Sequence, residues 1–344
     1  MISCPLLYGR DLVGEGHLAV HIRRREFLVS LGSAAAIWPL AVRSQQPKVF
    51  RIGITTIQER TSPPYAAFDQ RLRELGYVDG QNLAVELVNP NTHPEGIPGS
   101  IKQLLRRKVD VIIAPYERAV QSALAASETI PIVMIAIDYD PLALGYIKSL
   151  SQPGRNVTGL FLQQIELARK RVQILKDALP ELQTATMFWD LASEDQWKAT
   201  NEAAGALGLQ LIGVELREEP YNYEAALMRA PPDNRSVLIM PTSAVFYHDR
   251  QRLADFALKH RIASIFVLRE WVDAGGLLSY GASFPAMFRR AAEYVDRIAK
   301  GDKVADLPIE QPTQFELVLN LKTARAIGLT ISPATLVRAS EVIE

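Results

Sequence analysis

The regular alternation of short β-branched runs with helical patterns constrains the fold of this chain more than any other feature. It begins at Lys48 and continues to the C-terminus. The run 109–114 is typical of a strand buried on both faces, and the helical pattern after Ser62-Pro63-Pro64 ends at Gly76. Such alternation indicates βα units on parallel sheets. We therefore predict an α/β fold with two doubly wound parallel-sheet lobes joined by a hinge.

The predicted elements form two series around the turn-rich stretch 151–156, where we place a crossover between the lobes. The first series has strands 49–55, 83–88, 109–114 and 131–137, with helices 63–75, 95–107, 117–127 and 138–150. After strand 157–162, the second series has strands 184–189, 209–216, 236–240 and 263–268, with helices 164–179, 194–207, 222–230 and 245–260. A glycine-flanked strand at 274–281, a helix at 284–300, a strand at 315–320 and helices near 322–327 and 333–342 complete the chain. Two similar halves predict a cleft between them.

Composition excludes several classes of protein. The 38 Lys and Arg balance 38 Asp and Glu, which leaves no positive excess for a nucleic acid or an anionic membrane. Cys4 is the single cysteine, and the five histidines form no cluster with zinc spacing. Neither phosphate-binding glycine motif is present. We therefore expect no nucleic-acid partner, no metal site and no cofactor.

The N-terminal segment has the pattern of an export signal. Arg24-Arg25-Glu26-Phe27-Leu28 precedes a short apolar run, 29–40, that is too short to span a bilayer, and small residues follow near Ser44. This order resembles a twin-arginine signal peptide, so we interpret 1–44 as an upstream extension plus a signal. The alternative, an N-terminal amphipathic helix, explains the arginines but not Pro39 or the polar residues after it.

Two aspartates offer an alternative chemistry. Asp138 and Asp140 lie two residues apart after an apolar strand, where they could hold a cation or act as acid and base. Helix capping plus one polar ligand contact explains the same pair. We favour the second interpretation because no third carboxylate lies nearby in the sequence. We therefore assign no catalytic residue.

A ligand in an open α/β sheet lies outside the carboxyl ends of the strands, where helix N-termini present unpaired N–H groups. The loops after the predicted strands carry aromatic rings for a planar ligand, Arg118 or Arg269 for a carboxylate, and Asp138 or Asp190 for an amine. The candidate ligand-binding residues are Thr55, Thr56, Tyr65, Tyr116, Glu117, Arg118, Asp138, Tyr139, Asp140, Trp189, Asp190, Thr242, Arg269, Glu270 and Tyr280.

Several motifs along the chain occur together in one family. They are RREFL (24–28), LRELGYVDGQN (72–82), Asp140-Pro141, SLSQPGRNVTG (149–159), GGLLSYG (275–281) and LPIEQPT (307–313) with FELVLNLKTA (315–324). In this combination the chain resembles the ABC transporter substrate-binding protein family of tryptophan/tyrosine type. The likeness covers nearly all of 48–344. One departure is the turn at 115–117, where relatives tend to carry a small Gly-Thr-Pro-type turn.

The resemblance implies a periplasmic-binding-protein fold of type I, with lobe one at 48–158 and 276–306 and lobe two at 159–275 and 307–344. It also implies a function. The protein would be a periplasmic monomer that captures a small amino-acid-like or aromatic ligand by hinge closure. It would then deliver the ligand to an ABC permease with a cytoplasmic ATPase, without being an enzyme.

Two alternatives stay open at this point. A periplasmic sensor that hands the same kind of ligand to a signalling partner shares every residue argument. An exported α/β enzyme that uses Asp138 and Asp140 would instead turn its ligand over.

Overall fold

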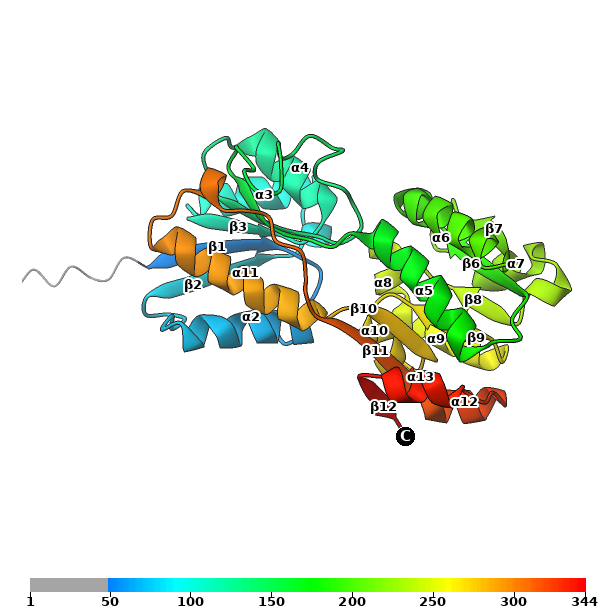
Figure 1. Cartoon of the computed structure of the whole chain (residues 1–344). Coiled ribbons are helices and arrows are strands. Elements are labelled where there is room, and N and C mark those ends of the chain that lie inside the picture. The colour runs from blue at the N-terminus through cyan, green and yellow to red at the C-terminus, as the bar shows by residue number, and fades with distance from the viewer. Residues whose placement is uncertain (1–48) are drawn as a thin grey trace, which may run out of the picture. The chain divides into compact units, whose positions relative to one another are not determined.

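The computed structural model describes residues 49–344, so the upstream extension and signal peptide predicted for 1–44 lie outside the described residues. The described part contains two sheets, each covered by helices on both faces (Figure 1). This arrangement confirms the predicted fold class of two α/β lobes. Within residues 49–344, no helix is long and apolar enough to cross a membrane.

The first sheet is entirely parallel, with the strand order β2-β1-β3-β4-β5. Its strands are β1 (Phe50–Thr55), β2 (Leu83–Val88), β3 (Val111–Ala114), β4 (Ile132–Ala136) and β5 (Val157–Phe161). The helices around it are α2 (Pro63–Glu74), α3 (Gly96–Arg106), α4 (Glu117–Ala126) and α11 (Phe284–Ala299), with single 3-10 turns η1 (Pro90–Thr92) and η4 (Val304–Asp306). This is one of the two common doubly wound orders, which reverses at β1 and β3 and opens a crevice beyond their carboxyl ends.

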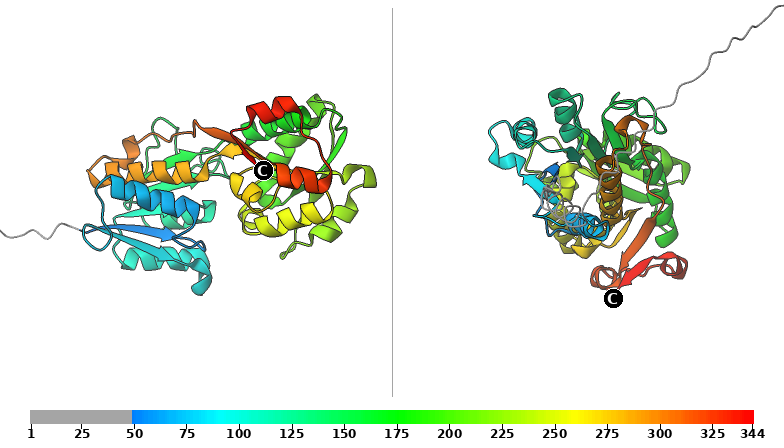
Figure 2. Two further views of the ribbon diagram at one scale, coloured as in Figure 1. Left: turned by 90° about the horizontal axis from the view of Figure 1, so that it is seen from below. Right: turned by 90° about the vertical axis from the view of Figure 1, so that its left-hand side faces the viewer.

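Helices α2 and α11 lie side by side on one face of the first sheet, and α3 and α4 cover the other face (Figure 2). The pair is formed by segments more than 200 residues apart in the chain: the rings of Tyr65 and Phe288 meet edge to face at 4.9 Å, and Arg71 binds Glu293 at 3.0 Å. Their burial removes apolar surface from water, which is the main force that holds α11 to this sheet.

The second sheet has the order β12-β11-β10-β9-β8-β6-β7 and is parallel except where β10 meets β11. Its strands are β6 (Thr184–Trp189), β7 (Gln210–Glu215), β8 (Val237–Ile239), β9 (Ala263–Phe266), β10 (Leu278–Ala282), β11 (Phe315–Asn320) and β12 (Glu341–Ile343). Its helices are α5 (Gln164–Ala178), α6 (Glu194–Ala206), α7 (Tyr223–Arg229), α8 (Ala244–His248), α9 (Arg250–Lys259), α10 (Arg269–Asp273), α12 (Leu321–Ile327) and α13 (Pro333–Arg338), with 3-10 turns η2 (Leu191–Ser193) and η3 (Pro232–Asn234).

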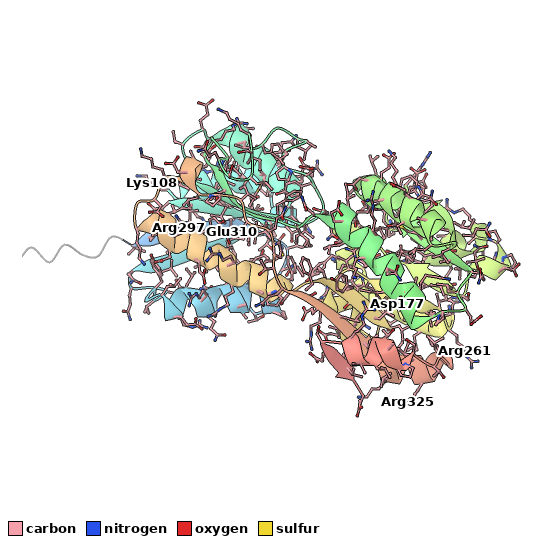
Figure 3. All side chains as sticks on the ribbon, viewed as in Figure 1. Lys108, Asp177, Arg261, Arg297, Glu310 and Arg325 are labelled. Carbon is pink, nitrogen blue, oxygen red and sulfur yellow. The ribbon has the colours of Figure 1, made fainter. Side chains whose placement is uncertain are left out.

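Neighbouring residues of β6 pack in two different hydrophobic cores, one on each face of this sheet. Met187 packs with α5 and α6, and Phe188 packs with α7 and α9. Successive side chains of a strand point to opposite faces, so a run that is apolar at every position requires helices on both sides. Asp177 near the end of α5 ties α13 to this layer, because its carboxylate accepts a bond from Arg338 at 2.5 Å (Figure 3).

The chain passes between the two sheets three times, and the positions of the passages correct the predicted lobe boundaries. β5 pairs with β4 over its whole length, so residues 159–161, predicted in lobe two, belong to the first sheet. β10 pairs with β9 and β11, so residues 278–282, predicted in lobe one, belong to the second sheet. The passages therefore fall after β5, between β10 and α11, and after Glu310, which bridges to Leu160.

Glu310 is anchored at the third passage. Arg290 of α11 holds its carboxylate with two bonds of 2.7 Å, and Glu310 lies beside that helix (Figure 3). Such a two-point contact between guanidinium and carboxylate fixes geometry as well as charge. The segment that leads to β11 therefore leaves the first lobe from a defined point.

Three predicted helices differ from the structure for local reasons. The helix predicted at 138–150 is a series of turns, in which the Oδ1 atom of Asp140 accepts the backbone N–H groups of Leu142 and Ala143. The helix predicted at 245–260 is divided at Asp249, whose carboxylate accepts bonds from Tyr223 and Arg252. The helix predicted at 333–342 ends early because residues 341–343 pair with β11.

Candidate functional site

The carboxyl ends of parallel strands in both sheets bring most of the predicted site residues to one edge of each sheet. In the first sheet, Thr56 follows β1, Tyr116 follows β3 and Asp138 follows β4. In the second sheet, Asp190 follows β6 and Thr242 follows β8. Ligands of open α/β folds bind at such edges. We therefore take the two strand-end edges as the candidate site.

The electrostatics of Asp138 indicate that the two edges face each other. Burial, with smaller contributions from the negative charges of Asp190, Glu117 and Asp195, raises the pKa of Asp138 to about 6. Asp190 and Asp195 belong to the second lobe, whereas Asp138 and Glu117 belong to the first. The interaction between two charges weakens with distance and is screened by salt, so one carboxylate shifts the pKa of another only when the two lie close together. Carboxylates of both lobes therefore share one region.

The side chain of Asp140 caps a turn. Its Oδ1 atom caps the turn that begins at Pro141, with bonds of 2.8 and 3.1 Å from two backbone N–H groups. Burial raises the pKa of Asp195 in the second lobe, and the charge of Asp140 acts in the same direction. The capping interpretation of this pair thus describes Asp140.

Three tyrosines form the aromatic part of the site, and the hydroxyl of a threonine lies beside them. Tyr65 is only 1% exposed, and its hydroxyl has no hydrogen-bond partner of regular geometry, although the Thr56 hydroxyl lies beside it. Burial raises the pKa of Tyr65 strongly, with smaller contributions from Tyr116 and from Tyr247 of α8. Burial also raises the pKa of Tyr116. Phenols from both lobes therefore lie near one another, and the Thr56 hydroxyl is the polar group nearest to that of Tyr65.

Asp190 is the centre of a hydroxyl network in the second lobe. Its carboxylate accepts bonds from Ser193 at 2.7 Å, from Ser243 at 2.6 Å and from Tyr221 at 3.3 Å. Asp190 is buried, and none of these three donors carries a positive charge. The network connects the end of β6 with the N-cap of α8, so it holds two strand-end loops together.

Thr242 contributes its backbone to this frame. Its N–H donates to Oε1 of Gln196 at 3.0 Å, and its carbonyl accepts from Nε2 of the same residue at 2.8 Å. The amide of Gln196 thus satisfies both backbone groups of a buried loop residue. The side chain of Thr242 is buried as well.

Glu270 marks the other end of the candidate site. It stands in the first turn of α10, where the sequence predicted a loop, and its Oε2 atom is buried without a partner. Burial raises the pKa of Glu270 to about 7, and the charges of Asp273 and Glu316 act in the same direction. Its charge in turn adds to the effect of burial on the pKa of Tyr247.

The two arginines predicted to bind a ligand carboxylate differ in their contacts. Arg269 forms two bonds of 2.5 and 2.7 Å to Glu341 of β12 and a third of 3.2 Å to Asp273. Arg118 is exposed on the first turn of α4. Arg269 is thus engaged in ion pairs within the second lobe, and its contact with a ligand carboxylate stays a prediction.

Five further predicted residues pack against or bond to other residues of the protein. The Thr55 hydroxyl lies 2.6 Å from that of Ser100 inside the first lobe. Tyr139 is buried among the α3 and α4 core, with its hydroxyl unpartnered. Trp189 stacks on Trp197 and Tyr280 stacks on Phe315, each with ring centres 6.2 Å apart. Glu117 accepts a hydrogen bond from the Tyr146 hydroxyl.

Sequence reasoning missed Arg171 of α5. It is 3% exposed, donates from Nε to the Tyr280 carbonyl at 3.0 Å and binds the side chain of Gln164. Burial lowers its pKa to about 9, since no carboxylate balances its charge. The position joins the start of α5 to the end of β10, next to two passages between the lobes. Arg171 lies within an ordinary amphipathic helical pattern, so no feature of the sequence marked it as a buried arginine.

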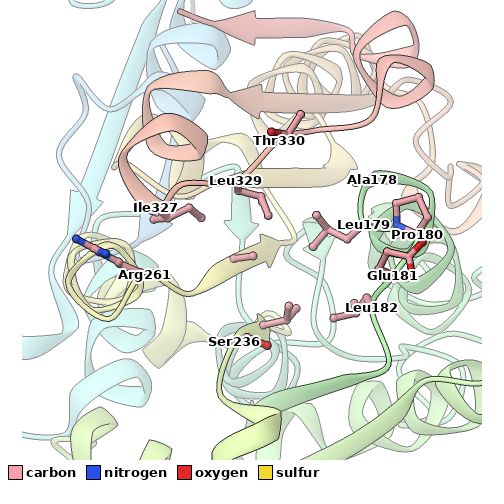
Figure 4. A pocket seen from close by; sticks show the side chains of 12 residues that line it. Ala178, Leu179, Pro180, Glu181, Leu182, Ser236, Arg261, Ile327, Leu329 and Thr330 are labelled. Carbon is pink, nitrogen blue, oxygen red and sulfur yellow. The ribbon is translucent and has the colours of Figure 1, made fainter.

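Away from the strand-end edges, the described residues form a cavity but no metal-holding group. Among residues 49–344, no group of three or more His, Cys, Asp or Glu is arranged to hold a metal ion. A cavity of about 410 Å³ lies at the amino ends of β8 and β9, lined mainly by apolar side chains with Arg261 and Glu181 at its rim (Figure 4). This cavity is at the opposite edge of the second sheet from Asp190.

The chain is similar to known proteins over most of its length. A family model described as ABC transporter substrate binding protein matches residues 61–343. The chain is also similar to a tyrosine-binding protein of Clostridioides difficile (strain R20291), with 23% identity over 294 residues and 83% of each chain covered.

Solved structures show the same fold. A conserved domain protein from Vibrio cholerae has a TM-score of 0.77 at 21% identity, over 86% of this chain and 100% of that one. An ABC domain in complex with L-Trp from Streptococcus pneumoniae has a TM-score of 0.76 at 22% identity, with the same coverage. A leucine-binding protein from Thermotoga maritima has a TM-score of 0.56 at 15% identity, over 75% and 86%. The predicted type I fold is confirmed.

Proposed function

The chain belongs to the ABC transporter substrate-binding protein family, and from this premise we propose that it is the solute-binding component of an ABC importer. It would capture a small amino-acid-like or aromatic ligand between the two strand-end edges and deliver it to a permease with a cytoplasmic ATPase. The family consists of binding proteins, and no step of this function needs covalent chemistry.

One observation carries the proposal. Asp138 follows β4 of the first lobe and Asp190 follows β6 of the second, and the charge of Asp190 acts on Asp138, so a ligand between these strand ends would contact both lobes. The similar proteins are a tyrosine-binding protein and a domain with bound L-Trp, which supports an amino-acid-like ligand. The phenols of Tyr65, Tyr116 and Tyr247 add flat apolar surface for such a ligand.

Hinge closure would couple binding to delivery. Three passages connect the lobes, and contacts that a ligand makes with both lobes exist only when the lobes are closed. A ligand shifts the population toward the state to which it binds more tightly. The closed, loaded form is then the form that a permease would recognise.

The site of action would be the periplasm. The segment around Arg24-Arg25-Glu26-Phe27-Leu28 has the order of an export signal, and twin-arginine passage is the route that this order favours. Replacement of Arg24 and Arg25 by lysine tests the route. We expect the precursor to accumulate in the cytoplasm, and unchanged export would contradict the twin-arginine proposal.

Thermal unfolding with a panel of ligands tests the function. The panel contains tyrosine, tryptophan, phenylalanine, leucine and aromatic acids. A ligand at 100 times its Kd stabilises a protein by about 2.7 kcal/mol, which raises the Tm measurably. We expect at least one saturable shift that is lost in Tyr116→Ala and retained in Arg269→Ala, because Arg269 is bound to Glu341. A panel without any shift would contradict the proposal.

A further inference from the structure

Arg171 of α5 connects two of the three passages between the lobes. Its Nε atom donates to the Tyr280 carbonyl at 3.0 Å, and its Nη2 atom donates to Oε1 of Gln164. Gln164 is the first residue of α5 and follows the first passage at 162–163. Tyr280 lies in β10, just before the second passage at 283. One side chain therefore bonds the lobe-two ends of both passages.

The third passage ends beside the same contact. It follows Glu310 and reaches β11 at Phe315, whose ring stacks on that of Tyr280 with ring centres 6.2 Å apart. β10 and β11 are antiparallel, and Ala282 at the end of β10 lies opposite Phe315. The lobe-two ends of all three passages therefore meet around Arg171 and Tyr280. We call Arg171, with its bonds to Gln164 and Tyr280, the hinge clamp.

The guanidinium of the hinge clamp is buried among neutral partners. Arg171 is 3% exposed and Gln164 is 5% exposed. The partners of Arg171 are a backbone carbonyl and an amide, and a charge taken out of water among neutral groups is costly. An apolar side chain would fill this position of an amphipathic helix without that cost. The two hydrogen bonds are therefore what the arginine adds to the structure.

The start of α5 depends on the hinge clamp. No side chain caps this helix at Gln163, and the N–H groups of a first helical turn have no partners inside the helix. The Nε2 atom of Gln164 is buried without a partner, so its Oε1 atom carries the contact that holds this side chain. Arg171 stands two turns further along α5. The hinge clamp therefore fixes the first turn to the body of the helix.

The first lobe holds the passages from its own side. Arg290 of α11 binds Glu310 with two bonds of 2.7 Å, at the start of the third passage. α11 itself begins at Phe284, directly after the second passage. One helix of lobe one thus fixes the lobe-one ends of two passages. Because both lobes hold these ends, a change of angle between the lobes falls on the few residues between them.

We propose that Arg171 is a positioning residue for lobe closure, which holds the lobe-two ends of the passages together so that lobe two turns as one body. This proposal rests on the proposed function and deepens it, because closure then depends on a residue that need not touch the ligand. Loose passage ends would have to be ordered each time the lobes close. The cost of that ordering would be subtracted from the ligand affinity, and a clamp formed before binding removes it.

Hydrogen exchange of the ligand-free protein, followed by mass spectrometry, tests the hinge clamp without any ligand. In Arg171→Met, peptides that cover 162–166 and 279–284 should exchange at least about tenfold faster, because two hydrogen bonds are lost there. Peptides of α6 and β7, in the same lobe, should keep their rates. The control is Arg169→Met, which removes an exposed arginine of the same helix and should change no rate.

A second variant strengthens the hinge clamp instead of removing it. Gln164→Glu places a carboxylate against the guanidinium of Arg171, and charge-assisted hydrogen bonds are stronger than neutral ones. Exchange in the two segments should slow by at least about threefold. In the double variant the glutamate has lost its partner, so exchange there should be faster than in Arg171→Met alone. Gln164→Glu keeps every partner, so it decides the proposal by itself if Arg171→Met does not fold.

Calorimetry with a ligand from the panel connects the hinge clamp with function. In Arg171→Met the affinity should fall by at least about fivefold, because closure must then order the passage ends. In Arg169→Met the affinity should stay within about twofold of the parent.

The other outcomes overturn the proposal or separate it from the proposed function. Unchanged exchange in the two segments of Arg171→Met, or equally faster exchange over all of lobe two, would overturn the hinge clamp. Weaker binding without faster local exchange, or faster local exchange with unchanged affinity, would overturn its role in closure. Gln164→Glu that does not slow exchange would overturn the pairing with Arg171. If no ligand of the panel binds the parent, the proposed function fails, and the exchange rates still decide the clamp.

Discussion

Replacement of Asp138 by asparagine should stabilise the ligand-free protein, although it removes a side chain of the binding site. Burial, together with the charges of Asp190, Glu117 and Asp195, moves the pKa of Asp138 from 3.8 to about 6. The native carboxyl therefore binds its proton more tightly than the unfolded one. Ionisation of Asp138 thus lowers the free energy of unfolding as the pH rises from about 4 to about 6.

The magnitude follows from the shift. About two pKa units at 1.36 kcal/mol each correspond to about 3 kcal/mol at pH 8, where the carboxylate is ionised in both states. At pH 4.5 the native carboxyl stays protonated, and the destabilisation that results from the pKa shift of Asp138 falls to about 1 kcal/mol. Asparagine has no charge to desolvate. The variant should therefore gain about 3 kcal/mol at pH 8 and about 1 kcal/mol at pH 4.5.

Urea unfolding at the two pH values measures this difference. At pH 8 a gain of that size corresponds to a rise in Tm of about 5 °C or more. Glu128→Gln, at the other end of the same strand, should change stability by less than about 0.5 kcal/mol at either pH. A loss of stability in Asp138→Asn at pH 8, or a gain that is the same at both pH values, would refute the reasoning.

Three further predictions concern the frame of the site. Asp190→Ala should cost about 3 kcal/mol in urea unfolding, because the buried hydroxyls of Ser193, Ser243 and Tyr221 lose their acceptor; Asp190→Asn should cost less, and equal costs would contradict this account. Gly159→Ala should cost more than about 3 kcal/mol, because its φ is +132° and a Cβ would lie 2.1 Å from the Met134 carbonyl oxygen; Gly205→Ala in α6 meets open space and should be neutral or stabilising. Arg269→Ala should cost at most about 1 kcal/mol and leave calorimetric ligand affinity within about twofold, whereas a large loss of affinity would restore Arg269 to the site.

The sequence predicted the sheets well because their signals are local. β2 was predicted with its observed bounds, 83–88, because a short run rich in Leu and Val lies there between turn residues at 80–82 and 89–90. The turns at 138–150 were predicted as a helix because Asp140-Pro141 is also a helix-start signal. β12 was missed because the end of the predicted helix pairs with β11, a contact that no local pattern shows.

The candidate site was predicted in position more than in detail. The rule that ligands bind beyond strand ends placed Asp138, Asp190 and Tyr116 on the two edges from their place in the sequence alone. The rule could not say which charged side chains stay unpaired. Arg269 is bound by Glu341, 72 residues away in the chain, and such a partner depends on tertiary structure.

Tyr247 and Asp195 are site residues that the sequence did not predict, for the same reason. Each stands in a helix that follows a strand, and the local pattern around each is that of an ordinary surface position in a helix. Their influence on Tyr65 and Asp138 appears only when the two lobes are assembled. In similar chains, polar residues in the first turns of helices that follow strands can therefore be predicted as candidate site residues.

Small-angle X-ray scattering of the purified mature chain, with and without a saturating ligand from the panel, tests the central claim most directly. Capture between two hinged lobes predicts a smaller radius of gyration at unchanged mass when the ligand is bound. A radius of gyration that stays the same while calorimetry shows full occupancy would contradict closure around the ligand.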